Sequence, residues 1–199
     1  MGTLVFSLDL IATFAFAVVG ARVAINRNMD YGGIILIALV ASISGGTLRN
    51  IFLGLTPSWL TQYEYYLAVI IAVIFAIVAP AKKPIGFFIL SLDTFGLGVA
   101  VVSGTQFALD KETPFYSAIL LGVITAVTGG LLRDVLCQVE PVLLHRETIG
   151  TSSVLGAGTY ALLDWLNVAT TISALAAGIV VILVRAVSIK FDLHLPRAK

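Results

Sequence analysis

The residues that could do chemistry in this chain are charged side chains set inside apolar stretches. Arg49 and Arg133 each follow a glycine pair, in the segments SGGTLRN and TGGLLRD. An ionised side chain inside a bilayer is costly, so it usually marks an ion or substrate pathway or a structural ion pair. A glycine pair in mid-helix permits a break or a kink, and the carbonyls so freed need protein or a water-filled cavity. The two segments predict a polar pathway lined by Ser44, Gly45, Gly46, Thr47, Arg49, Asn50, Thr128, Gly129, Gly130, Arg133 and Asp134.

Helix packing is the alternative explanation of the small residues. They recur every four positions, at Ala38, Ser42 and Gly46 and again at Gly122, Ala126 and Gly130. Small residues at this spacing are the usual signature of close helix contact in membranes. Packing explains the small residues taken alone, whereas an arginine after each glycine pair favours a water-accessible pathway.

Two aspartates, Asp9 and Asp93, lie at depths that match the two arginines. Asp9 and Arg49 each lie about six residues, or roughly 9 Å, from the outer end of their stretches. Asp93 and Arg133 have the mirrored relation at the inner side. Depth therefore predicts the ion pairs Asp9–Arg49 and Asp93–Arg133. The alternative, that each aspartate is only an interfacial group near its own helix end, stays open.

Seven apolar stretches must position these residues. A membrane span needs about 20 apolar residues to cross roughly 30 Å of hydrocarbon. The stretches that qualify are about 3–24, 33–55, 65–80, 86–109, 115–139, 148–165 and 168–189. Apolar residues make up 59% of the 199 residues and charged residues 12%, and the mean hydropathy is +1.04. Soluble domains carry about 25% charged residues. We therefore expect an all-α membrane protein with seven transmembrane helices in a single transmembrane domain, 1–199, and not a soluble enzyme.

Other classes of site are not supported by the sequence. The net charge of +1 argues against a nucleic-acid surface, which needs a dense basic face. The single cysteine, Cys137, is too few for a zinc site, and both histidines lie outside the apolar stretches. No nucleophile–histidine arrangement can be assembled inside the membrane. We expect no enzymatic activity, no bound metal and no cofactor, with potassium or sodium only as permeant ions.

The orientation follows from the basic residues of alternate loops. One side carries nine of them: Arg22, Arg27, Lys82, Lys83, Arg146, Arg185, Lys190, Arg197 and Lys199. The other side carries only Lys111. This bias predicts a multi-pass protein of the cell (plasma or inner) membrane with its N-terminus outside and its C-terminus in the cytoplasm. Five aromatic residues then lie at the outer interface: Trp59, Tyr63, Tyr65, Tyr66 and Trp165.

An internal repeat relates the two glycine–arginine segments. Residues 8–60 match residues 92–144 at 13 of 53 positions without gaps, at an offset of 84 residues. The matches include Asp9 with Asp93 and Arg49 with Arg133, which apolar composition alone does not produce. Each copy holds three spans, an odd number, so the second copy must enter the membrane from the opposite side. We expect two inverted three-helix repeats, about 3–80 and 86–165, plus a seventh helix at about 168–189; such repeats are typical of transport proteins.

With its seven spans and its paired SGGTLRN and TGGLLRD segments, the chain resembles the bacterial branch of the trimeric intracellular cation (TRIC) channel family. The domain of this family is also labelled a glycine transporter. The resemblance covers about residues 3–190 and implies a homotrimer in membrane lipids. It implies an hourglass, water-filled pore in each subunit, beside second and fifth helices kinked at their glycines, that passes monovalent cations, chiefly potassium. The Lys-Glu-Val motif of animal relatives is absent from the fifth span, so the lipid binding and voltage sensing attributed to that motif are not expected.

The residues themselves leave the transport mechanism open. The intramembrane charges are Asp9, Asp93 and Asp134 against Arg49 and Arg133, a net of −1 that favours cations only weakly. Pore radius and carbonyl placement can decide selectivity instead. A potassium-permeable channel is the first hypothesis. A secondary transporter of a small zwitterion such as glycine is the second, and a structural or lipid-scaffolding protein is the third.

Overall fold

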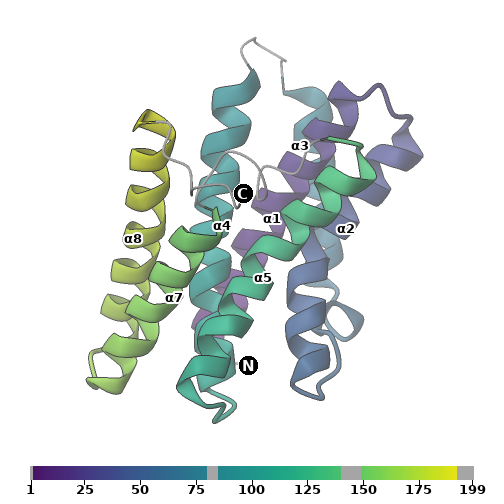
Figure 1. The fold of residues 1–199 in the computed structure, drawn as a ribbon. Helices are drawn as coiled ribbons and strands as arrows, with labels where there is room; N and C mark the ends of the chain where they lie inside the picture. Colours follow the sequence, from purple (N-terminus) through teal and green to yellow (C-terminus); the bar gives the residue numbers. More distant parts are fainter. Residues whose placement is uncertain (1, 80–84, 140–148, 192–199) are drawn as a thin grey trace, which may run out of the picture.

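The computed structural model describes residues 2–79, 85–139 and 149–191, which form a bundle of helices (Figure 1). Seven α-helices and one short 3₁₀ helix make up these residues. Their bounds are α1 Thr3–Asn26, α2 Tyr31–Phe52, η1 Ser58–Leu60, α3 Glu64–Val78, α4 Ile85–Leu109, α5 Phe115–Leu136, α7 Ile149–Trp165 and α8 Thr170–Phe191. Each predicted span overlaps one of the seven helices, so the expected all-α fold with seven helices is confirmed.

Five of the helices, α1, α2, α4, α5 and α8, are long and apolar enough to cross a membrane. α3 has 15 residues and α7 has 17, which gives them lengths of about 22 and 26 Å. The predicted span 33–55 is shifted toward its N-terminus. The Asp30 side chain accepts a hydrogen bond from the Gly33 N–H and starts α2 early, and the left-handed Gly54 follows its end.

The ends of corresponding helices share one backbone geometry. α1 is followed by a left-handed residue at Asn28 and α4 by one at Glu112, whereas α2 is followed by Gly54 and α5 by Gln138. Such residues turn the chain so that the last carbonyls of a helix find backbone donors. Each pair is separated by the offset of 84 residues that aligns the sequence with itself. This correspondence is what a structural repeat predicts.

α1 and α4 lie at the centre of the bundle. α1 packs against α2, α3 and α4, and α4 packs against α5, α7 and α8. Alanines such as Ala17, Ala21 and Ala108 are fully buried where these helices meet. The outward faces carry exposed large apolar side chains, for example Ile71 on α3 and Leu183 on α8, as a lipid-facing surface requires. α8 lies at one edge of the bundle, beside α7 and α4 (Figure 1).

α2 and α5 are in contact and are helical without interruption through their glycine pairs. The sequence allows a break or a kink at these positions, and the structure shows no break. The reason lies in how the two helices meet.

Candidate functional site

The crossing of α2 and α5 depends on the first glycine of each pair. A methyl group added at Gly45 would overlap the backbone carbonyl of Thr125, and one added at Gly129 would overlap the carbonyl of Ala41. Both glycines are buried. They let the two backbones touch, as small residues do between membrane helices. Gly45 and Gly129 therefore serve the close approach of two intact helices.

The second glycine of each pair has a different environment. A methyl group at Gly46 would meet only Nη2 of Arg49, at 3.8 Å, and one at Gly130 only Nη2 of Arg133, at 3.7 Å. Both glycines are partly exposed. Gly46 and Gly130 thus leave space beside the arginine of their own helix, so the two members of each pair have separate roles.

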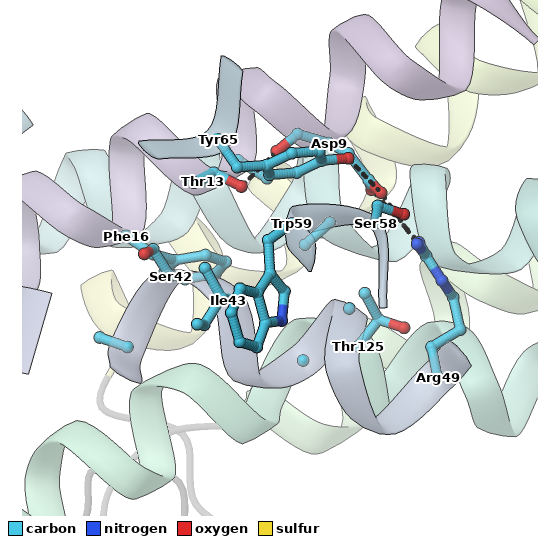
Figure 2. Close-up of a pocket in the computed structure, with 15 residues that line it drawn as sticks. Asp9, Thr13, Phe16, Ser42, Ile43, Arg49, Ser58, Trp59, Tyr65 and Thr125 are labelled. Carbon is cyan, nitrogen blue, oxygen red and sulfur yellow. Dashed lines mark hydrogen bonds and ion pairs between the residues drawn. The ribbon is translucent and has the colours of Figure 1, made fainter. Parts of the chain in front are cut away.

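Arg49 forms one of two charge clusters, named the outer and the inner cluster after the orientation predicted from the sequence. Its Nη1 and Nη2 donate to Oδ1 and Oδ2 of Asp9 at 3.2 and 2.9 Å (Figure 2). Two parallel hydrogen bonds of this kind make the strongest arginine–carboxylate geometry. The guanidinium also lies 4.1 Å from the ring centre of Phe107, a cation–π contact. Arg49 is fully buried, so its charge is compensated entirely inside the protein.

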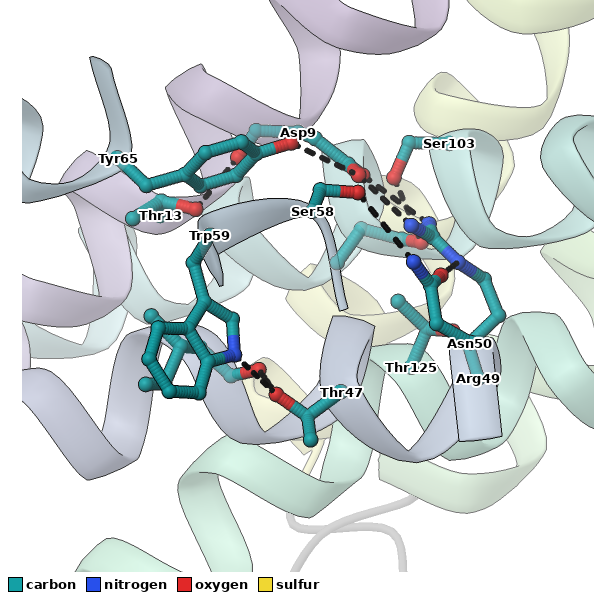
Figure 3. Close-up of polar contacts among 12 residues, drawn as sticks. Asp9, Thr13, Thr47, Arg49, Asn50, Ser58, Trp59, Tyr65, Ser103 and Thr125 are labelled. Atoms are coloured by element: carbon teal, nitrogen blue, oxygen red, sulfur yellow. Dashed lines mark hydrogen bonds and ion pairs between the residues drawn. The ribbon is translucent and has the colours of Figure 1, made fainter. Parts of the chain in front are cut away.

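Asn50 ties this outer cluster to the loop between α2 and α3. Its Oδ1 accepts a hydrogen bond from Nε of Arg49 at 3.1 Å. Its Nδ2 donates to the carbonyl of Thr56 at 2.9 Å and to the hydroxyl of Ser58 at 3.3 Å (Figure 3). The loop is thereby held next to the Asp9–Arg49 pair.

Two aromatic residues complete the outer cluster. Nε1 of Trp59 donates to Oγ1 of Thr47 at 2.9 Å, which fixes the indole on α2 (Figure 3). The hydroxyl of Tyr65 lies 3.5 Å from Oδ2 of Asp9. The sequence assigned both residues to the outer membrane interface, whereas the structure turns them toward the polar cluster.

A small cavity lies between α1, α2, α5 and this loop (Figure 2). Asp9, Gly46, Trp59 and Thr125 are among its lining residues, and its volume is about 30 Å³. This is the volume of about one water molecule. Four predicted pathway or ion-pair residues therefore border it: Asp9, Gly45, Gly46 and Arg49.

Arg133 forms the inner charge cluster. Its Nη1 lies 2.8 Å from Oδ1 of Asp93, and its Nε lies 2.8 Å from Oδ1 of Asp134. Nη2 of Arg185, from α8, lies 3.3 Å from Oδ2 of the same Asp93. Both predicted pairs, Asp9 with Arg49 and Asp93 with Arg133, are thus in contact, and the inner one has additional members.

The remaining predicted pathway residues carry hydroxyl groups. Thr47 and Thr128 donate to carbonyls of their own helices, those of Ile43 and Ile124. The buried hydroxyl of Ser44 has no hydrogen-bond partner among the residues that the structure describes. It lies near the α2–α5 crossing, on the side of Gly129.

Two arginines, Arg22 and Arg185, were included in the count of basic residues that predicts the orientation. The structure buries both of them within helices. Arg22 donates through Nη2 to the carbonyl of Ala79 at 2.6 Å, and Arg185 is 1% exposed. Both positions lie inside the predicted spans 3–24 and 168–189, so the rule for intramembrane charges could have found them. Without these two, seven basic residues remain on the predicted cytoplasmic side, of which Lys82, Lys83, Arg146, Arg197 and Lys199 lie outside the described residues.

Comparison with known sequences places the chain among membrane proteins. The family model described as "Glycine transporter" matches it twice, over residues 6–81 and 90–165. The "UPF0126 membrane protein" of Vibrio cholerae is 30% identical over 98% of this chain and 82% of its own length. The "UPF0126 inner membrane protein YadS" of Escherichia coli K12 is also 30% identical, over 97% of this chain and 95% of its own length.

Comparison with solved structures agrees in fold over almost the whole chain. The TRIC trimeric intracellular cation channel orthologue from Rhodobacter sphaeroides has a TM-score of 0.91 and 34% identity, covering 96% of this chain and 100% of that one. A prokaryotic TRIC channel has a TM-score of 0.85 and 26% identity, covering 98% and 100%. These relatives are ion channels and not enzymes, and the curated relatives are membrane proteins, so this chain is a multi-pass inner-membrane protein without enzymatic activity. The chain belongs to the prokaryotic TRIC channel family, whose domain is also described as a glycine transporter.

Proposed function

We propose that the protein is a potassium-permeable cation channel whose pathway runs through each subunit along the polar faces of α2 and α5. The observation that carries this proposal is the pair of buried charge clusters, Asp9–Arg49 and Asp93–Arg133, one on each side of the α2–α5 crossing. Charges held at this depth in a membrane mark ion pathways. The solved relatives are named as cation channels, which supports the same function here.

The narrowest part of the proposed hourglass is the α2–α5 crossing itself. Gly45 meets Thr125 there and Gly129 meets Ala41, backbone against backbone. The neighbouring cavity has room for about one water molecule, so conduction requires it to widen. We expect the cavity to widen on the face beside Gly46 and Gly130. A methyl group at either glycine would meet only an arginine side chain there, so no backbone atom opposes the widening.

Selectivity in this proposal comes from oxygen ligands rather than from net charge. The intramembrane charges predicted from the sequence have a net of −1, but the buried Arg185 brings three arginines against Asp9, Asp93 and Asp134. Counted over the residues that the structure describes, the two clusters thus hold as many arginines as aspartates. Hydroxyl and carbonyl oxygens favour cations through their dipoles without a net charge, and Ser44 and Thr128 supply such groups near the crossing.

The proposed assembly is a homotrimer in the lipid of the inner membrane, with the N-terminus outside and the C-terminus in the cytoplasm. The name of the Rhodobacter sphaeroides relative describes a trimeric channel, which supports the trimer. The excess of basic residues on one side of the predicted topology supports the orientation.

A carrier of a small zwitterion such as glycine is the second candidate, because the matching family model is described as a glycine transporter. Carriers of this kind hold a carboxylate at the N-terminus of a broken helix. α2 and α5 are unbroken and offer no such terminus at their glycine pairs. This observation favours the channel.

Recording from the purified protein in a planar bilayer under a potassium chloride gradient tests the proposal. We expect unitary current steps that reverse near the equilibrium potential of potassium, and no change when glycine is added. Absence of unitary currents together with saturable uptake of radiolabelled glycine into liposomes would instead establish the carrier.

A further inference from the structure

A groove lies between α4 and α8 near the start of α4 and the end of α8. The two helices are close at Gly98 and Gly178, where a methyl group added to Gly98 would lie 3.5 Å from the carbonyl of Gly178. Nearer the inner side, a space of about 400 Å³ lies between the same two helices. Its lining comes from α4 and α8 alone, and most of the lining residues are exposed. Because α8 is at the edge of the bundle (Figure 1), the groove of one subunit opens toward the surrounding lipid.

The groove is apolar along its length and basic at one end. Six of its nine lining residues are apolar: Phe87, Leu90, Phe95, Ile182, Ala186 and Ile189. The buried hydroxyl of Thr94 donates to the carbonyl of Leu90 at 2.7 Å, so it needs no donation to an occupant. Lys190 lines the groove from the last turn of α8. It is exposed, and its Nζ lies 5.6 Å from the ring centre of Phe191.

The length of the groove matches one hydrocarbon chain in one leaflet. α4 rises about 12 Å from Phe87 to Phe95, and α8 rises as far from Ile182 to Lys190. Half of the hydrocarbon core of a bilayer is about 15 Å thick. An empty space of this size would forfeit dispersion contacts along its walls, and its apolar walls offer water few partners. A lipid chain supplies the missing contacts.

We propose that this groove binds a phospholipid of the inner leaflet, with one acyl chain between α4 and α8 and its phosphate on the ammonium group of Lys190. A phosphate accepts charge-assisted hydrogen bonds from an ammonium group. Basic residues at the cytoplasmic interface are attracted to anionic headgroups. The hydroxyl of Ser91, also in the lining, lies where it can donate to an ester oxygen of the lipid. The site is a property of the membrane surface of α8, and it goes beyond the proposed conduction.

The groove adjoins the contact between α8 and the inner charge cluster. Thr94 directly follows Asp93 on α4, and Ala186 directly follows Arg185 on α8. Nη2 of Arg185 lies 3.3 Å from Oδ2 of Asp93. A chain in the groove therefore packs on both helices next to this contact and holds α8 against α4. Bound lipid should raise the melting temperature, as any ligand of the folded state does.

Lipid binding to the purified, delipidated protein in detergent tests the site, with native mass spectrometry as the measurement. Dioleoylphosphatidylglycerol should bind at about one molecule per subunit. Dioleoylglycerol, which has the same chains and no phosphate, should bind about tenfold more weakly. Lys190→Gln should weaken the binding of the phospholipid by the same factor and leave that of dioleoylglycerol unchanged. Lys111→Gln is the matched control, because Lys111 is exposed beyond the opposite end of α4, and it should bind both lipids as the wild type does.

A second pair of variants tests the position of the acyl chain. Ala186→Phe fills the groove with a side chain, so it should abolish the binding of both lipids. Val187→Phe is its control, since Val187 is 46% exposed on the next position of α8 and does not line the groove. This control should bind both lipids as the wild type does.

These measurements need no ionic current, so they stand apart from a failure of the proposed channel. Equal affinities of the wild type and Lys190→Gln for the phospholipid would overturn the phosphate contact. An equal loss of binding in Ala186→Phe and Val187→Phe would place the lipid elsewhere on the apolar surface and overturn the site. Dissociation of the assembled protein by Ala186→Phe, but not by Val187→Phe, would make the groove a contact between copies of this chain. If Ala186→Phe does not fold, the comparison of the two lipids on the wild type and Lys190→Gln decides, and equal affinities throughout overturn the inference.

Discussion

At the scale of single residues, the main feature of the structure is the pairing of buried arginines with buried aspartates, Arg49 with Asp9 and Arg133 with Asp93. Removing one partner of such a pair leaves an uncompensated ion, whereas removing both leaves a neutral gap, so the loss from a single change exceeds the loss from the double change. The outer cluster depends on one carboxylate, Asp9, with its arginine at 2.9 Å. The inner cluster shares Asp93 between two arginines. The two aspartates are therefore not equivalent, although they occupy the same position of the repeat.

We expect Asp9→Asn and Arg49→Gln each to destabilise the folded protein by about 3–5 kcal/mol, and the double variant to lose less than either. Asp93→Asn should lower the melting temperature more than Asp9→Asn, because it removes a carboxylate that two buried arginines, Arg133 and Arg185, share. Thermal unfolding of the purified protein in detergent measures both effects. Strict additivity in the Asp9–Arg49 cycle would mean that the two groups are energetically independent.

At the scale of helices, sequence and structure agree on where charges lie but differ on what the glycines do. Depth along the spans was enough to place Asp9 beside Arg49 and Asp93 beside Arg133. The spacing of small residues could not distinguish a break from a contact, because both need glycine. Which glycine of a pair touches the neighbouring helix depends on how α2 and α5 are rotated about their axes. The spacing of small residues along one helix does not determine that rotation. Arg185 was missed because α8 has no counterpart in the repeat and its arginine was counted with the cytoplasmic flank.

The glycine pairs give an internal comparison. Gly45→Ala places a methyl group against the Thr125 carbonyl, a backbone atom that cannot rotate away. It should cost about 1–3 kcal/mol of stability by overpacking the α2–α5 contact. Gly46→Ala is the matched control, since its methyl group meets only the end of the Arg49 side chain, and it should change stability by less than about 0.5 kcal/mol. Gly129→Ala and Gly130→Ala should repeat the contrast on α5. Equal melting temperatures for Gly45→Ala and Gly46→Ala would show that α2 and α5 can move apart to accommodate the methyl group at little cost in stability.

The loop between α2 and α3 covers the outer side of the cavity through Trp59. Trp59→Phe removes the hydrogen bond to Thr47 while keeping an aromatic ring. If the loop limits access to the pathway, the variant should have a higher open probability with an unchanged unitary conductance. Trp165→Phe is the control, because Trp165 is 72% exposed at the end of α7. Single-channel recording gives both quantities, and equal open probabilities for the two variants would exclude the loop as a barrier.

At the scale of the whole molecule, both charge clusters and the cavity are built from helices of one chain. Asp9, Arg49 and Trp59 come from α1, α2 and the following loop, and the inner cluster comes from α4, α5 and α8. Among the described residues, every arginine of the two clusters contacts an aspartate of the same chain. In a trimer, the proposed pathway therefore lies within each subunit, and the contacts around the threefold axis serve assembly.

Subunit mixing tests this arrangement. Gly46→Leu and Gly130→Leu together should block a subunit by filling the face beside its arginines, while leaving the Gly45 and Gly129 contacts intact. Trimers assembled from wild-type and blocked chains, separated by an affinity tag on one of them, should conduct in proportion to the number of wild-type subunits. Trimers with one blocked subunit should keep about two thirds of the wild-type current, because each pathway is separate in a closed, symmetric assembly. A single blocked subunit that abolishes the current of the whole trimer would place one shared pore on the axis and would remove the pathway from α2 and α5.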